Sequence, residues 1–106
     1  MAAAFTELER RRYLDDGAAA RAYVRGRLTK GLGRSRLAAE LAARGVTGEL
    51  AREVLTELVP ADDTEAARAV AARSSKKDPA ALGRSLARKG FSGRAIRVVV
   101  GEWDGE

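Results

Sequence analysis

Apolar residues recur three or four positions apart along most of the chain, and this spacing predicts amphipathic helices rather than strands. The pattern is clearest in two stretches, residues 37–58 and 82–103. Each predicts a helix, a break at a glycine and a second helix, with the break at Gly45 in the first stretch and at Gly90 in the second. Because the two glycines lie 45 residues apart, we expect an internal repeat rather than a single helical hairpin.

Short polar side chains mark where the expected helices begin. Asp15-Asp16 and the segment Asp62–Glu65, which has the spacing of a capping box, each precede an apolar periodic segment. The pair Asp78-Pro79 is typical of the first turn of a helix. A hydroxyl side chain follows each glycine break, at Thr47 and at Ser92, and is expected to cap the next helix. We therefore expect helices at about residues 2–12, 17–29, 34–44, 48–58, 63–75, 79–89 and 93–103.

The helical spacing also separates a buried face from an outer one. Glu49, Glu53 and Glu57 are spaced by four and are expected on the outer face of their helix. Arg36 and Glu40 have the same spacing and are expected to pair weakly at the surface. The side chains expected in the core are Ala20, Val24, Leu28, Leu37, Leu41, Ala51, Val54, Leu55, Leu58, Leu82, Leu86, Ile96, Val99, Val100 and Trp103.

These elements predict an all-α fold of tandem three-helix repeats, elongated and curved. We expect one repeat at residues 13–59 and a second at 60–106. Residues 1–12 are expected to be a remnant helix of an earlier repeat, because Phe5–Leu8 echoes Leu55–Leu58. A unit of about 45 residues is marginally stable alone, so each is expected to bury surface against its neighbour.

The charge distribution suggests an anionic partner. The formal net charge is +5 and the isoelectric point is about 10.2. Two clusters of basic residues have almost no acidic residue among them, which favours a nucleic-acid or acidic-protein contact over an ordinary solvated face. The candidate binding residues are Arg21, Arg25, Arg27, Lys30, Arg34, Arg36, Arg73, Lys76, Lys77, Arg84, Arg88, Lys89, Arg94 and Arg97.

The composition argues against catalysis. The chain has no histidine and no cysteine, so the usual nucleophile–base pairs and thiolate metal sites are excluded, and no cofactor or metal is expected. No apolar run approaches the roughly 20 residues of a membrane span. The first residues lack the basic and apolar regions of a signal peptide, so a cytoplasmic location is expected.

One alternative is a small DNA-binding protein that acts alone through a helix-turn-helix. In that interpretation the helix after Gly45 enters the major groove. The three glutamates of that helix argue against this, because they would meet phosphates. The corresponding helix after Gly90 carries Arg94 and Arg97 and is the better candidate.

Taken together, the order and spacing of these motifs resemble the RecX family of regulatory proteins. The resemblance covers about residues 13–103, although family members carry a complete first repeat before the Leu-Asp-Asp segment. In the first repeat of this chain it rests on Tyr13 to Asp16, Arg21, Tyr23, Val24, Arg25, Arg27, Leu28, Gly31, Gly33, Leu37, Leu41, Gly45 and Val46. In the second it rests on Asp62, Asp63, Arg73, Leu82, Leu86, Lys89 to Ser92 and Ile96.

The resemblance implies a function as well as a fold. RecX proteins modulate the RecA recombinase, usually as inhibitors, so it implies a non-enzymatic regulator of recombination and of the SOS response. The expected partner is a RecA filament on DNA, with sequence-independent contact to single-stranded or duplex DNA and a monomeric chain. The basic residues named above are the candidates for these contacts.

Overall fold

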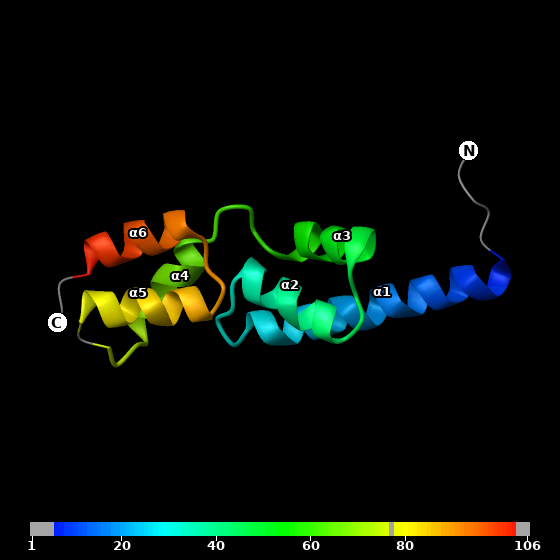
Figure 1. The fold of residues 1–106 in the computed structure, drawn as a ribbon, viewed down its shortest axis with the longest axis horizontal. Coiled ribbons are helices and arrows are strands. Elements are labelled where there is room, and N and C mark those ends of the chain that lie inside the picture. The colour runs from blue at the N-terminus through cyan, green and yellow to red at the C-terminus, as the bar shows by residue number, and fades with distance from the viewer. Residues whose placement is uncertain (1–5, 77, 104–106) are drawn as a thin grey trace.

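The chain folds into helices joined by short loops (Figure 1), and the computed structural model describes residues 6–76 and 78–103. Within these ranges there are six α-helices and no strand. The molecule is elongated, with extents of 58 × 25 × 19 Å, so the predicted all-α, elongated fold is confirmed. The helices are α1 (Glu7–Leu28), α2 (Arg34–Ala43), α3 (Gly48–Leu58), α4 (Thr64–Ala72), α5 (Pro79–Arg88) and α6 (Gly93–Glu102).

Two groups of three helices lie end to end along the long axis, and each has its own apolar core (Figure 1). We call α1–α3 the first unit and α4–α6 the second unit. Most of the side chains predicted to face inward are buried or packed against these cores. The first core contains Ala20, Val24, Leu32, Leu37, Leu41, Val54, Leu55 and Val59. The second contains Ala67, Val70, Ala71, Leu82, Leu86, Phe91, Ala95 and Val99.

Helix α1 differs from the prediction of two helices separated near Asp15-Asp16. It is one continuous helix of 22 residues that begins at the N-cap Thr6. The Thr6 hydroxyl accepts a hydrogen bond from the amide of Glu9, and the Glu9 carboxylate accepts one from the amide of Thr6, forming a capping box. Asp15 and Asp16 are exposed in mid-helix, so their predicted capping role was wrong.

The N-terminal half of α1 extends beyond the other helices (Figure 1). Its side chains are exposed, including Leu8 and Leu14, and Gly17 is its first buried residue. Residues 1–5, which include the Phe5 of the sequence echo, lie outside the described residues. Residues 7–16 therefore belong to neither apolar core.

The two predicted glycine breaks are confirmed. Gly45 and Gly90 each have a positive φ, +86° and +91°, directly after α2 and α5. A side chain disfavours this left-handed conformation, which explains a glycine at both helix ends. Ser92 caps α6 by accepting a hydrogen bond from the amide of Ala95 at 3.1 Å. Thr47 occupies the N-cap position of α3, but its side chain makes no capping hydrogen bond.

The start of α4 also differs from the prediction. The expected capping box at Asp62–Glu65 is absent, although Asp62 does accept a hydrogen bond from the amide of Thr64 at 3.0 Å. The carboxylate of Asp63 instead reaches α6, where it accepts hydrogen bonds from the amide and the hydroxyl of Ser92, both at 2.7 Å. Asp63 therefore ties the start of α4 to the start of α6. In the same unit, Asp78 caps α5 before Pro79 as predicted.

Candidate partner-binding surface and the joint between units

Several basic residues proposed for partner binding are engaged inside the first unit. The Arg21 Nε atom on α1 lies 3.1 Å from the Glu57 carboxylate on α3. On the same side, the Tyr13 hydroxyl donates to the carboxylate of Glu53 at 3.3 Å. Glu49, Glu53 and Glu57 are exposed, as predicted for the outer face of α3. Glu53 and Glu57 in addition hold α3 against α1.

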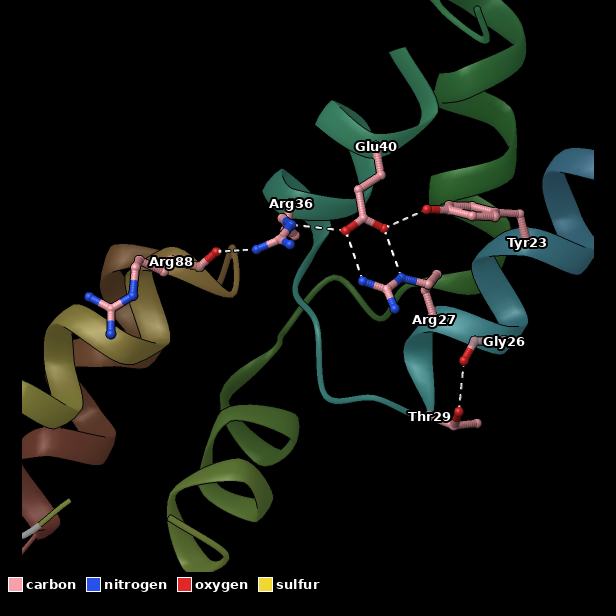
Figure 2. A network of polar contacts seen from close by, with 7 residues as sticks. All are labelled: Tyr23, Gly26, Arg27, Thr29, Arg36, Glu40 and Arg88. Carbon is pink, nitrogen blue, oxygen red and sulfur yellow. Dashed lines mark hydrogen bonds and ion pairs between the residues drawn. The ribbon is translucent and has the colours of Figure 1, made fainter. Parts of the chain in front are cut away.

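A network around Glu40 joins α1 to α2 (Figure 2). The Glu40 carboxylate accepts hydrogen bonds from the Tyr23 hydroxyl at 2.8 Å and from Arg27 at 2.9 and 3.0 Å. It also accepts one from Arg36 Nε at 2.9 Å. The Arg44 guanidinium lies over the Tyr23 ring, 4.3 Å from its centroid, in cation–π geometry. The predicted Arg36–Glu40 pair is present, within an interface rather than on an open face.

The network shifts the ionisation of its members. The hydrogen bond from Arg27 is the main reason that the pKa of Glu40 falls to about 2, with Tyr23 and Arg36 adding to it. The same contact raises the pKa of Arg27, and the Glu40 carboxylate raises the pKa of Tyr23. Glu40 is therefore an anion at any physiological pH, and it neutralises guanidinium charge that would otherwise face a partner.

The two units meet end to end, α5 against α2. The amide of Gly33 donates to the carbonyl of Lys89 at 2.7 Å, and the amide of Ser35 donates to the carbonyl of Gly90 at 3.2 Å. Arg36 adds a hydrogen bond from Nη1 to the carbonyl of Arg88 at 3.1 Å, visible in Figure 2. The first amides of α2 and the last carbonyls of α5 lack partners in their own helices, so each end satisfies the other. The start of α2 therefore lies against the end of α5.

This contact requires glycine. A Cβ atom on Gly33 would lie 2.4 Å from the carbonyl oxygen of Gly90, and one on Gly90 would lie 2.2 Å from the amide nitrogen of Arg36. Both distances are far shorter than any real carbon contact, so the backbones could not approach this closely with side chains present. We call this contact the joint.

A basic cavity of about 460 Å³ opens beside the joint. Its lining combines Lys30 of the first unit with residues of the second, including three serines. Among the described residues, no carboxylate lines the cavity or forms an ion pair with its basic side chains. The lining residues are Lys30, Val70, Arg73, Ser74, Ser75, Lys76, Ser85, Arg88 and Lys89.

The structure thus divides the candidate residues by their surroundings. Arg21, Arg27 and Arg36 belong to ion pairs within the first unit. Arg34 donates to the Thr56 hydroxyl at 3.2 Å. Lys77 lies outside the described residues. Lys30, Arg73, Lys76, Arg88 and Lys89 are brought together at the cavity, and Arg25, Arg84, Arg94 and Arg97 are exposed elsewhere.

Sequence reasoning missed the roles of Tyr23, Glu40 and the cavity serines. The spacing of Arg36, Glu40 and Arg44 places them on one face of α2, but it carries no sign that α1 covers that face. In the described part of the chain, no group of acidic residues is arranged to hold a metal ion. No described helix has the length and apolar character needed to cross a membrane.

Comparison with known proteins agrees with this architecture. Residues 15–55 match the family model described as RecX, second three-helix domain. Over 87 residues the chain is 41% identical to the regulatory protein RecX of Chromohalobacter salexigens. The chain belongs to the RecX family of regulatory proteins.

The alignment covers most of this chain but only part of its relative. The aligned residues cover 77% of this chain but only 57% of the Chromohalobacter protein. The matched second three-helix domain ends within α3, so it falls in the first unit described above. No solved structure matches the chain.

Proposed function

We propose that this protein binds RecA recombinase filaments on DNA and inhibits their activity. Its membership of the RecX family carries this proposal, because members of that family act as modulators of RecA. The elongated shape and the exposed basic residues of both units support it, since a filament on DNA is long and anionic. The contacts assigned to the partner are those of the exposed residues Arg25, Arg84, Arg94 and Arg97 and of the cavity.

The structure offers no support for the alternative in which α3 reads a DNA groove. Two of the three α3 glutamates contact α1, and the third, Glu49, pairs with Arg52 on α3 itself. Helix α3 therefore presents no free basic side chain of the kind that anchors a recognition helix to phosphates. The proposed function rests instead on surfaces outside this helix.

The proposal is tested by the ATPase rate of RecA on single-stranded DNA with increasing amounts of this protein. We expect the rate to fall, and to stay low when further DNA is added, because the protein acts on the filament. A rate that recovers in proportion to the added DNA would mean that the protein only occupies DNA sites. No change at about micromolar protein, with the chain shown to be folded, would contradict the proposal.

A further inference from the structure

We infer that a second cavity beside the joint is the docking site for recombinase protein, and that it takes a large apolar side chain with a carboxylate next to it. The inference rests on the proposed function and deepens it, because it names the surface that contacts protein. The cavity has a volume of about 350 Å³, and we call it the apolar pocket. Its lining residues, which come from both units and the segment between them, are Arg34, Ser35, Ala38, Pro60, Ala61, Asp63, Gly90, Phe91 and Ser92.

The lining of the apolar pocket is unlike that of the basic cavity. The two share no residue, although Lys89 of the basic cavity is followed directly by Gly90 of the pocket. Ala38, Pro60 and Phe91 contribute apolar surface, and the pocket contains no lysine. The core of a protein interface is apolar, enriched in aromatic residues and poor in charge. The pocket therefore suits a protein better than it suits the phosphates of a nucleic acid.

Most polar groups of the pocket already have hydrogen-bond partners within the chain. The Asp63 carboxylate accepts from the amide and the hydroxyl of Ser92, both at 2.7 Å. The Gly90 carbonyl accepts from the amide of Ser35 at 3.2 Å. Groups that are satisfied in this way gain little from a polar ligand. An apolar side chain leaves these bonds intact and gains the free energy of burial.

Arg34 determines what should lie next to that apolar side chain. Its guanidinium donates to the Thr56 hydroxyl at 3.2 Å. Among the described residues it forms no ion pair, whereas Arg27 and Arg36 of the same unit are held by Glu40. A carboxylate of the partner can therefore pair with Arg34 at the edge of the pocket through charge-assisted hydrogen bonds. This charge complementarity selects an apolar residue with an acidic neighbour.

The pocket is open to the surface and formed before any partner binds. Ser35, Pro60, Ala61 and Ser92 are exposed around it, whereas Phe91 is only 5% exposed. Sites for small ligands usually enclose most of the ligand, so an open pocket better suits one side chain projecting from a larger surface. Because the joint already holds the two units together, little ordering is needed when a partner docks.

The test measures the affinity of the full chain for RecA filaments assembled beforehand on single-stranded DNA, and in parallel for the bare DNA. The test variant is Ala61→Trp, which fills the pocket from an exposed position without changing the charge. The matched control is Ala69→Trp, at an exposed position of α4 that does not line the pocket. We expect Ala61→Trp to weaken filament binding about tenfold and to change the affinity for bare DNA less than about threefold. The control should change either affinity less than about threefold.

A second variant tests the carboxylate contact. Arg34→Gln should weaken filament binding about fivefold, and the loss should be greater than for bare DNA. Equal losses on filaments and on bare DNA would assign Arg34 to the nucleic acid and overturn this part of the inference. Circular dichroism of each variant establishes that it is folded.

The outcomes separate the inference from the proposed function. A wild-type chain that does not bind filaments contradicts the proposed function itself. If the wild type binds and Ala61→Trp binds equally well, or if both tryptophan variants lose affinity equally, the proposed function stands and the pocket is excluded. Sedimentation velocity of the chain alone tests the other occupant. Self-association of the wild type that is lost in Ala61→Trp would assign the pocket to a second copy of the chain and overturn the inference.

Discussion

At the scale of single residues, Glu40 determines which arginines of the first unit remain available to contact a partner. Its carboxylate holds Arg27 and Arg36 and accepts a hydrogen bond from Tyr23, and its own side chain is only 15% exposed. The two guanidiniums would repel each other without it. The same residue connects the core of the first unit to the joint, because Arg36 reaches the carbonyl of Arg88.

We predict that Glu40→Gln lowers the free energy of unfolding by about 1–3 kcal/mol, because the amide leaves a charged, largely covered network without its anion. Chemical denaturation at neutral pH measures this. The pKa of Glu40 is lowered from 4.5 to about 2 in the folded chain. Its stabilisation is therefore fully present above pH 4.5 and is lost as the pH falls from 4.5 towards 2. The loss of unfolding free energy between pH 4.5 and 2 should therefore be smaller in Glu40→Gln than in the wild type. If stability depends on pH identically in the two proteins, the stabilising role of the Glu40 carboxylate is contradicted.

Gly33 is the second residue with a specific structural role. Its backbone is in an extended conformation that any residue can adopt, so the requirement for glycine comes from the 2.4 Å approach to Gly90 alone. We predict that Gly33→Ala breaks the joint and speeds hydrogen exchange of the Ser35 amide by about tenfold or more. Gly26→Ala is the matched control, because nothing lies within 4 Å of its Cβ position. The control should gain about 0.5–1 kcal/mol of helix stability. Unchanged Ser35 exchange in Gly33→Ala would show that the joint is not closed in solution.

At the scale of elements, α1 shows where sequence reasoning succeeded and where it failed. The break at Asp15-Asp16 was expected because acidic residues favour helix starts, yet a helix interior tolerates them at modest cost. The start of α1 is instead marked by the capping box of Thr6 and Glu9. These two residues lie within residues 2–12, which the sequence analysis expected to form a separate helix. Local propensity could not decide between these two starts.

The other five helices were predicted to within three residues at either end, because glycine breaks and apolar spacing are local signals. The candidate site was less predictable. Its members were chosen from the sequence for their positive charge. Only the fold separates the arginines bound to Glu40 and Glu57 from the cations gathered at the cavity. The spacing of residues within one helix does not reveal which other helix, distant in sequence, will contact it.

We predict that Thr6→Ala frays the N-terminal half of α1 at a cost of about 1 kcal/mol, whereas Asp15→Ala is neutral or slightly stabilising. Because this half lies outside the core, the loss should affect amide protection near Glu9 and leave the global midpoint of unfolding almost unchanged. Hydrogen exchange followed by NMR distinguishes the two variants. A larger loss in Asp15→Ala would restore the interpretation with a helix start at that residue.

At the scale of the whole molecule, two small units lie end to end along one long axis and meet through backbone hydrogen bonds. The joint brings the start of α2 against the end of α5, and Lys30 lies beside the cations of the second unit. The chain spans 57% of the length of its Chromohalobacter relative. Whether the N-terminal half of α1 belongs to an earlier repeat stays a prediction, as does the curvature of the rod.

The central claim is that this chain binds recombinase filaments. Co-sedimentation tests it most directly, with RecA filaments assembled beforehand on single-stranded DNA, at a salt concentration where the chain does not bind the bare DNA. The account predicts that the chain pellets with the filaments and saturates at a fixed ratio to RecA protomers. A folded chain that stays in the supernatant at about micromolar concentration would contradict the account.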